Sequence, residues 1–335
     1  GIYSFFSKNQ VPVKNIIQNL NKIQHRGHDS YGILVKSDTN FLLKHEKGKI
    51  PNYYGAEMGN IFLGHLRYKT SGLSSENGAQ PIISQNQFGS FYFVFNGNIP
   101  CDEYDTKYTL DSNMIKDFFE RNSDNSNNWS ELLIKFQNKF KRAFSIILVT
   151  DKNELFLIKD RYGVRPLAYS YSSEHQQFEA ASESVGLGEV ETTNVSEVKP
   201  GEILGFNLDN ISSPKIIYNY NSKQPQAKTY GGKCIFEYIY FLNPETVWDH
   251  VLVNNIRKNW AETLALSDKE MIETRVNHIV IGIPSTGIEP GKAYAKTLEL
   301  PYFQAITKNP DVNRTFILSG EERDRVSKKK YIFFY

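Results

Sequence analysis

Four polar residues in the first third of the sequence could together hold an amino acid and hydrolyse an amide. Asn96 and Gly97 offer a side-chain amide and an unhindered backbone N–H, which are neutral donors suited to an oxyanion. Arg67 offers a planar guanidinium that can bind a carboxylate through two hydrogen bonds. Asp111 offers a carboxylate for an ammonium group. These residue types predict an amidase site that recognises both charged groups of an α-amino acid.

Each of these residues also has an ordinary structural explanation. Asn-Gly is the commonest hairpin turn, and here it follows the aromatic run at residues 91–95, which predicts a strand that ends in a tight turn. Asp111 is a good helix N-cap, and that role is compatible with binding. Most arginines lie at the surface or in ion pairs, so Arg67 gains meaning only from the sequence around it.

The elements that must position these residues follow from the apolar pattern. Residues 12–24 and 129–140 have apolar side chains at helical spacing, which predicts two amphipathic helices. Residues 144–150 and 154–159 predict a hairpin of two strands. Strands dominate this half of the chain, which suggests two sheets covered by helices. A polar stretch at residues 219–230 marks the expected boundary between a domain at 1–228 and a second at 229–335.

The second domain begins with a pattern typical of a parallel sheet. Residues 278–284 form a continuous apolar run, a helix is expected to open at Glu289, and residues 301–307 predict a second strand. Strand, helix and strand in this order predict a βαβ unit. The turn of Ser285, Thr286 and Gly287 between the first strand and the helix could present backbone N–H groups to a phosphate.

Composition narrows the class of protein. The 335 residues carry a net charge of +2, so neither a nucleic-acid partner nor an acidic surface is implied. No signal peptide or membrane-spanning run is visible, so no membrane partner is expected. Cys101 and Cys234 are the two cysteines; they make neither a disulfide framework nor a metal site by themselves, which favours a reducing, cytoplasmic compartment.

A series of motifs resembles the class II glutamine amidotransferases, which belong to the N-terminal-nucleophile hydrolases. They include His-Arg-Gly-His-Asp-Ser-Tyr-Gly at 25–32, Gly-His-Leu-Arg-Tyr-Lys-Thr-Ser-Gly at 64–72 and Phe-Asn-Gly-Asn at 95–98. The match continues through residues 159–167, Ala-Ser-Glu-Ser at 181–184 and residues 199–203. Residues 234–241, 308–309 and 314–317 narrow the resemblance to the amidophosphoribosyltransferase family. The motifs cover nearly the whole chain in the family's order.

The resemblance implies both a fold and an activity. The fold is α+β / α/β: an αββα sandwich followed by an incomplete type I phosphoribosyltransferase domain. The activity is hydrolysis of glutamine and transfer of the ammonia to phosphoribosyl diphosphate, which gives phosphoribosylamine in the first step of de novo purine synthesis. The family also implies a homo-oligomer in the cytoplasm.

The resemblance assigns roles on the glutamine side. Its nucleophile is a Cys, expected directly before Gly1, whose own α-amine serves as the base. Asn96 and Gly97 would bind the oxyanion, Arg67 the substrate carboxylate and Asp111 its ammonium. Two further residues, Arg26 and Asp29, would brace the site. The histidines at 25, 28 and 65 are interpreted as structural.

The transferase side departs from the family pattern. Ser285, Thr286 and Gly287 stand where the family's diphosphate loop lies, but Ser285 replaces a usually acidic residue and Gly287 a common Ser. Lys308 and Arg314 match a loop that closes over phosphoribosyl diphosphate. The acidic loop that binds the ribose and Mg²⁺ is expected beyond Tyr335, so we expect a fragment or a degenerate homologue, inactive as it stands. Cys234 matches an iron–sulfur ligand of some relatives, which leaves a cluster undecided.

Two alternatives remain open on the sequence. One is another class II glutamine amidotransferase, of the glucosamine-phosphate synthase or asparagine synthetase type, which would require an isomerase or an ATP pyrophosphatase domain downstream. The other is a catalytically dead homologue that still binds glutamine or a partner. The encoded residue directly before Gly1 separates the dead homologue from the enzyme.

Overall fold

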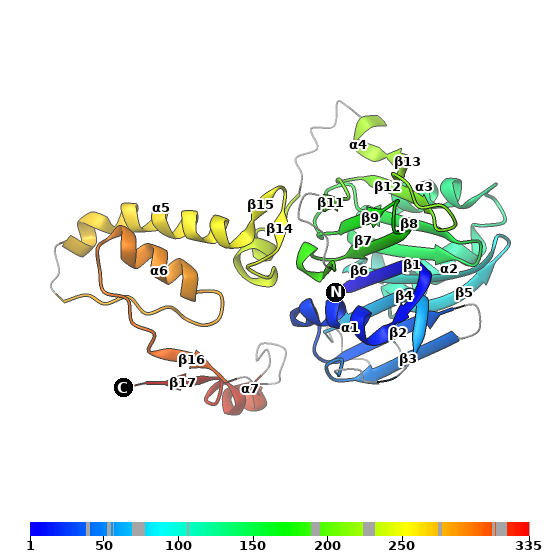
Figure 1. Cartoon of the computed structure of the whole chain (residues 1–335). Coiled ribbons are helices and arrows are strands. Elements are labelled where there is room, and N and C mark those ends of the chain that lie inside the picture. Colours follow the sequence, from blue (N-terminus) through cyan, green and yellow to red (C-terminus); the bar gives the residue numbers. More distant parts are fainter. Residues whose placement is uncertain are drawn as a thin grey trace. The chain divides into compact units, whose positions relative to one another are not determined.

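The computed structural model describes residues 1–37, 41–51, 55, 57–68, 78–105, 107–188, 195–223, 232–273, 277–309, 312 and 320–334. The chain forms two compact units, Gly1–Cys234 and Ile235–Tyr335 (Figure 1). The expected domain boundary after residue 228 lies outside the described residues.

The first unit contains two antiparallel sheets packed face to face (Figure 1). The seven-stranded sheet has the order β11-β9-β10-β1-β4-β2-β3, and the six-stranded sheet has the order β13-β12-β8-β7-β6-β5. The strands of the first are β1 (Ile2–Pro12), β2 (Ser30–Lys36), β3 (Phe41–Lys47), β4 (Met58–Arg67), β9 (Ala168–Ser172), β10 (Gln177–Ala181) and β11 (Ser196–Glu197). Those of the second are β5 (Ile82–Asn86), β6 (Gly89–Asn98), β7 (Ala143–Thr150), β8 (Glu154–Lys159), β12 (Glu202–Asn207) and β13 (Lys215–Asn219).

Helices cover the outer faces of both sheets. Helix α1 (Val13–Lys22) packs on the seven-stranded sheet, whereas α2 (Asp111–Arg121) and α3 (Trp129–Lys139) pack on the six-stranded sheet. Short helical turns lie at η1 (Gln24–Arg26), η3 (Cys101–Glu103), η4 (Ser184–Gly186) and α4 (Tyr220–Lys223). The layers are therefore helix, sheet, sheet and helix, and the predicted αββα sandwich is confirmed.

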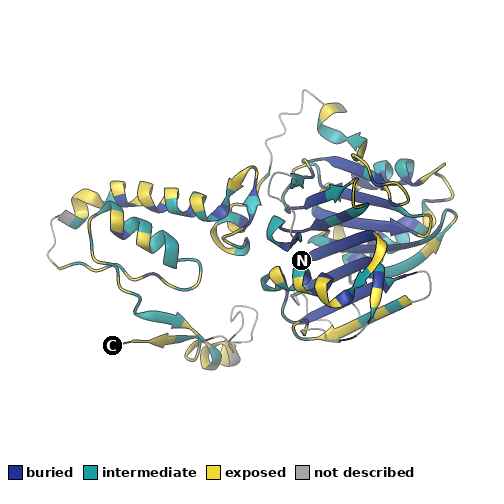
Figure 2. Cartoon of the chain, viewed as in Figure 1, coloured by how far each residue is buried: buried dark blue, intermediate teal, exposed yellow. Residues whose placement is uncertain are grey.

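Strand β6 shows why the central strands are apolar on both faces. Phe91, Phe93 and Phe95 point toward α2 and α3, whereas Tyr92 and Val94 point toward the other sheet. All five side chains are buried (Figure 2). Because successive side chains alternate between two covered faces, the strand reads as a continuous apolar run rather than as an alternating one.

The predicted turn at residues 96–97 is wrong. Strand β6 continues to Asn98, and Asn96 and Gly97 pair with Ser145 and Phe144 of β7. The glycine is needed for close packing: a Cβ at Gly97 would lie 2.5 Å from the carbonyl oxygen of Ala143. The helices expected within 12–24 and 129–140, and the hairpin of β7 and β8, are confirmed.

The second unit is built around two helices. Helix α5 (Val253–Glu273) packs against α6 (Ile288–Thr297). The π-helix (Glu237–Phe241) and the hairpin of β14 (Val247–Trp248) and β15 (Val251–Leu252) lie against α5. The unit also contains α7 (Gly320–Ser327) and β16 (Ile306–Lys308), which pairs antiparallel with β17 (Tyr331–Phe333).

The predicted βαβ unit is found only in part. Helix α6 is present, but residues 278–284 contain a single bridge, the parallel pair of Val280 with Tyr302, instead of a strand. Within the described residues no further strand pairs with this run, and Ile279 and Ile283 are 59% and 60% exposed. An apolar run that shares only one bridge with another segment lacks the ladder of backbone hydrogen bonds that makes a regular strand. No helix in the described ranges combines the length and apolar character needed to cross a bilayer.

Candidate active site

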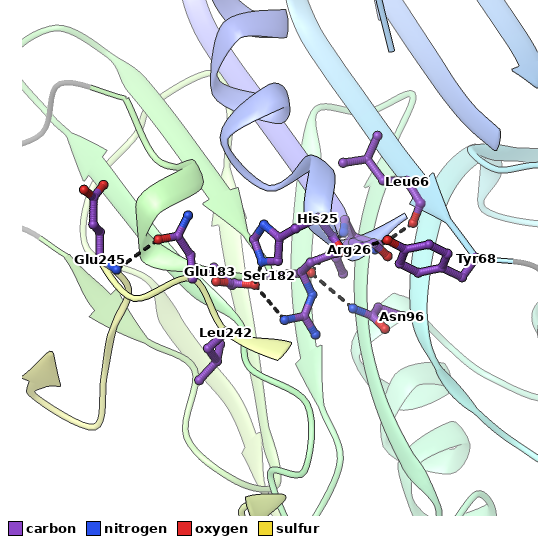
Figure 3. Close-up of polar contacts among 12 residues, drawn as sticks. His25, Arg26, Leu66, Tyr68, Asn96, Ser182, Glu183, Leu242 and Glu245 are labelled. Carbon is purple, nitrogen blue, oxygen red and sulfur yellow. Dashed lines mark hydrogen bonds and ion pairs between the residues drawn. The ribbon is translucent and has the colours of Figure 1, made fainter. Parts of the chain in front are cut away.

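The first strand places Gly1 at a fixed point between two other segments. The Gly1 nitrogen donates to the carbonyl oxygens of Leu66 at 2.7 Å and Arg26 at 3.5 Å (Figure 3). The Leu66 N–H donates back to the Gly1 carbonyl at 2.8 Å. The beginning of the chain is thus held by the backbone of β4 and by the turn η1.

Gly27 allows this turn to lie directly on β4. A Cβ at Gly27 would lie 2.2 Å from the backbone nitrogen of Arg67, so no larger residue fits without a shift of backbone. Two residues on, the Asp29 N–H donates to the Arg67 carbonyl at 3.0 Å. The structure therefore brings Arg26 and Asp29 to the segment that carries Arg67.

The buried carboxylate of Glu183 binds two side chains of the turn η1. Glu183 accepts hydrogen bonds from Arg26 Nη1 at 2.7 Å and from His25 Nε2 at 2.6 Å (Figure 3). Burial favours the neutral form of Glu183, but the Arg26 guanidinium and the contact with His25 outweigh it and lower its pKa to about 2. The contact of His25 with Glu183 is compatible with the structural role that the sequence analysis gave to this histidine.

Ser182 links the first strand to Asn96. Its Oγ accepts the Ile2 N–H at 2.9 Å and the Asn96 side-chain N–H at 3.2 Å, and its own N–H donates to the Ile2 carbonyl at 2.9 Å. A carboxamide carries two N–H hydrogens. Only the one on Ser182 has an acceptor among the described residues, so the second remains available to a ligand.

The edge of β6 carries the Gly97 N–H between two occupied neighbours. The Phe95 N–H donates to Gln80 Oε1 at 2.6 Å, and the Ile99 N–H donates to Asp111 Oδ2 at 3.3 Å. Because N–H groups two residues apart on a strand point to the same side, the Gly97 N–H points to this edge as well. Strand β5 begins only at Ile82, opposite Phe93, and does not reach Gly97. Among the described residues, no acceptor for the Gly97 N–H lies at this edge, next to the residue that carries the Asn96 amide.

Asp111 is the first residue of α2 rather than its N-cap, which is Leu110. Its carboxylate accepts the Ile99 N–H and, at 2.9 Å, the Ser112 N–H. Burial raises the pKa of Asp111, and these hydrogen bonds and the charge of Arg67 oppose the rise. Arg67 ends β4, and its guanidinium lies against Gly78, where a Cβ would be 2.6 Å from Cζ. The two residues are thus close enough to interact electrostatically.

The fully buried His65 side chain adds no charge to this site. Burial, the amine of Gly1 and Arg67 together hold the pKa of His65 well below its usual range, so the imidazole is neutral. Within the described ranges, no three His, Cys, Asp or Glu side chains are grouped as a metal site would require.

The residues predicted on the transferase side lie in the second unit. Ser285, Thr286 and Gly287 form the turn that leads into α6. The Gly287 N–H donates to the Ile283 carbonyl at 2.9 Å, so that donor is used within the turn. Lys308 ends β16, and Arg314 lies outside the described residues. Cys234, in the first unit, is a partly buried free thiol, as is Cys101.

Four further residues contact the segments that carry the predicted glutamine-site residues, and the sequence analysis gave them no role. They are Gly27, Gln80, Ser182 and Glu183. Two of them, Ser182 and Glu183, lie in the Ala-Ser-Glu-Ser motif. The feature of the sequence that could have indicated them is a small polar residue and an acidic residue directly after an apolar strand. The geometry needed to assign them comes only from the pairing of β10 with β1.

Comparisons with known proteins agree with the motifs. A family model described as a glutamine amidotransferase domain matches residues 65–188. An amidophosphoribosyltransferase from Methanothermobacter thermautotrophicus is 28% identical, and the alignment covers 98% of this chain and 69% of that protein. The Escherichia coli amidophosphoribosyltransferase is 26% identical over 95% of this chain and 66% of its own.

Solved structures give the same fold. The glutamine phosphoribosylpyrophosphate amidotransferase from Bacillus subtilis, complexed with ADP and GMP, superposes with a TM-score of 0.73 at 23% identity, over 99% of this chain and 71% of that chain. A structure described as the allosteric regulatory enzyme of purine biosynthesis gives a TM-score of 0.70 at 24% identity. The resemblance to the amidophosphoribosyltransferases is confirmed over nearly the whole chain.

Proposed function

We propose that this protein is a glutamine-dependent amidophosphoribosyltransferase, whose first unit hydrolyses glutamine to supply ammonia. One observation carries the proposal: the second hydrogen of the Asn96 amide and the Gly97 N–H have no acceptor among the described residues and lie on neighbouring residues of β6, and Ser182 links Asn96 to Ile2 at the start of β1. Two preorganised neutral donors beside the start of that strand are what an oxyanion of amide hydrolysis requires.

The nucleophile in this proposal is a Cys directly before Gly1. The Gly1 nitrogen is fixed by the carbonyls of Leu66 and Arg26, so a preceding residue would start from a defined position. Its thiolate would attack the glutamine Cδ, and its α-amine, which titrates near neutrality, would take up the thiol proton. The electron pair of the C=O bond then moves to the oxygen, where Asn96 and Gly97 donate. The protonated α-amine then returns this proton to the amide nitrogen, the C=O bond re-forms, the C–N bond breaks and ammonia leaves. Water afterwards hydrolyses the thioester to glutamate and regenerates the thiol.

Arg67 and Asp111 would select the amino acid. The Arg67 guanidinium can bind the α-carboxylate through two hydrogen bonds. The Asp111 carboxylate is buried and fixed by two backbone N–H groups, which leaves it acceptor capacity for an ammonium. Arg26, through its carbonyl and Glu183, and Asp29, through the Arg67 carbonyl, would keep both segments in place.

The transfer step is proposed from the relatives' activity and from the fold of the whole chain. Phosphoribosyl diphosphate would accept the ammonia at C1 and release diphosphate, with Ser285, Thr286, Gly287, Lys308 and Arg314 on its side. The family's Mg²⁺ finds no set of acidic ligands among the described residues, so no step is assigned to it. Cys234 alone likewise does not make an iron–sulfur site. We also propose a cytoplasmic homo-oligomer.

A chain with Cys placed before Gly1, as its free N-terminus, tests the glutaminase. We expect ammonia release from glutamine, measured by a coupled glutamate dehydrogenase assay. The matched control carries Ser at the added position, because its hydroxyl is a far weaker nucleophile. A folded Cys-bearing chain that binds glutamine and releases no ammonia would overturn the proposal in favour of a binding protein without catalysis.

A further inference from the structure

We infer that Ser182 is a positioning residue of the amidase site: its hydroxyl orients the Asn96 carboxamide relative to the first strand. This inference rests on the proposed function and assigns a role to the Ala-Ser-Glu-Ser motif. Ser182 is fully buried, and both oxygen lone pairs accept a hydrogen bond, one from Ile2 N–H and one from Asn96 Nδ2. The same oxygen atom therefore fixes the position of Asn96 on β6 relative to Ile2 on β1.

The two contacts of the Ser182 hydroxyl differ in how easily they are replaced. The first strand has further anchors: the Ser182 N–H to the Ile2 carbonyl, the pairing of Tyr3 with Ala181, and the two bonds between Gly1 and Leu66. The Asn96 side chain has no recorded partner other than Ser182 among the described residues. Removal of the hydroxyl should therefore free the Asn96 amide while the strand stays in place.

Orientation matters because the Asn96 amide has one hydrogen for Ser182 and one for the oxyanion. If the amide rotates about χ2, the second hydrogen no longer points to a defined position, and the donor loses the preorganisation on which oxyanion stabilisation depends. Glutamine binding would be little affected, since Arg67 and Asp111 do not contact Ser182 through any recorded bond. The expected signature is a loss in kcat with an unchanged KM.

A double-mutant cycle in the Cys-bearing chain tests this coupling. We expect Ser182→Ala to lower kcat for glutamine hydrolysis by about tenfold, less than the ~10²–10³-fold loss when an oxyanion donor is removed. In the Asn96→Ala background the same Ser182→Ala change should lower kcat by less than about twofold, because its target is gone. A Ser182→Ala effect of equal size in both backgrounds would overturn the inference.

Ser4→Ala is the matched control. Ser4 is a buried serine on β1, in the sheet whose strand β10 ends directly before Ser182, and its Oγ has no hydrogen-bond partner among the described residues. Its removal takes one buried hydroxyl from the neighbouring strand and should leave kcat within about twofold. If Ser4→Ala and Ser182→Ala lower kcat equally, the effect belongs to the packing of the sheet and the inference fails.

A second readout does not depend on turnover. The side-chain ¹⁵N–¹H resonances of Asn96, identified by their loss in Asn96→Ala, should shift and exchange faster with solvent in Ser182→Ala but not in Ser4→Ala. Unchanged Asn96 resonances would refute the inference whatever the activity. Changed resonances in a chain without ammonia release would instead refute the proposed glutaminase and keep the positioning contact, so the two failures are distinguishable.

Discussion

Asp111 and Gly97 are joined through a single strand edge: the Asp111 carboxylate accepts the N–H of Ile99, the second residue after Gly97. The two residues therefore share a backbone frame, because Ile99 directly follows the last residue of β6. A group proposed to bind the substrate ammonium and a donor proposed to bind its oxyanion thus keep a constant separation. Substitutions at one position should not displace the other.

Replacing Asn96 by Ala should slow the chemical step of glutamine hydrolysis. Loss of one oxyanion donor costs roughly 2.7–4 kcal/mol in kcat, and KM should change little because the donor acts on developing charge. Steady-state kinetics of the Cys-bearing chain measures both. The control is Asn138→Ala, which removes the same group from α3, where Asn138 accepts from Tyr218. Equal kcat for Asn96→Ala and its parent would return Asn96 to a structural role.

Replacing Arg67 should weaken binding of glutamine. Hydrogen bonds to a charged group contribute about 1.5–3 kcal/mol, so Arg67→Ala should lower kcat/KM by roughly tenfold to a hundredfold, mainly through KM. Arg67→Lys keeps the charge but not the planar fork, and should recover only part of the loss. Arg142→Ala, which breaks an exposed pair with Glu103, serves as the control. Full recovery by Lys would contradict a two-bond carboxylate contact.

Gly27→Ala should destabilise the first unit. The new methyl group would meet the backbone of Leu66 and Arg67 rather than a mobile side chain, so the turn or β4 must shift. Overpacking of this kind costs about 1–3 kcal/mol in the free energy of unfolding, measurable by urea titration. Gly320→Ala is the control, since nothing lies within 4 Å of its Cβ position. Wild-type stability of Gly27→Ala would show that the turn does not rest on β4.

Glu183 should make stability sensitive to acid. Its folded pKa of about 2 lies below the ordinary 4.5, so the stabilisation is present above pH 4.5 and is lost as pH falls toward 2. With about 1.36 kcal/mol per pKa unit, the loss across this window is about 3 kcal/mol. Unfolding free energies at pH 7 and pH 3 measure the part of this loss that occurs above pH 3, about 2 kcal/mol.

Glu183→Gln should remove most of this pH dependence, although it also lowers stability at pH 7 because Arg26 keeps its buried position without a carboxylate. Glu103→Gln, at an exposed ion pair, should change stability by less than about 1 kcal/mol at either pH. An unaltered acid response in Glu183→Gln would place the acid sensitivity in other groups.

The sandwich could be predicted because both faces of its strands are covered. Runs such as 91–95 and 144–150 are apolar throughout, and the helices at 13–22 and 129–139 have clear periodic apolar faces. The turn at Asn96 was predicted wrongly because a local preference for Asn-Gly hairpins competes with pairing to β7, and eight ladder partners along β6 decide the outcome. Tertiary pairing is not visible in a window of four residues.

The site residues differ in how much of their role is local. Arg67, Asn96, Gly97 and Asp111 could be proposed from their chemistry together with the short motifs that contain them. Ser182 could not, because its significance lies in contacts with residues 86 and 180 positions away in the sequence. The run at 278–284 also shows that a local pattern does not determine tertiary pairing. Its isoleucines predict a strand, but a strand needs hydrogen-bonded partners, which the apolar pattern does not specify.

The position of β1 between β10 and β4 has a consequence for motion. Chain ends usually fray, but the amides of Ile2 and Tyr3 belong to a strand that is bonded on both sides. Their solvent exchange should therefore require opening of the whole sheet, with a free energy near that of global unfolding. Ile2 and Tyr3 should therefore form one of the most rigid parts of the first unit, directly beside Ser182.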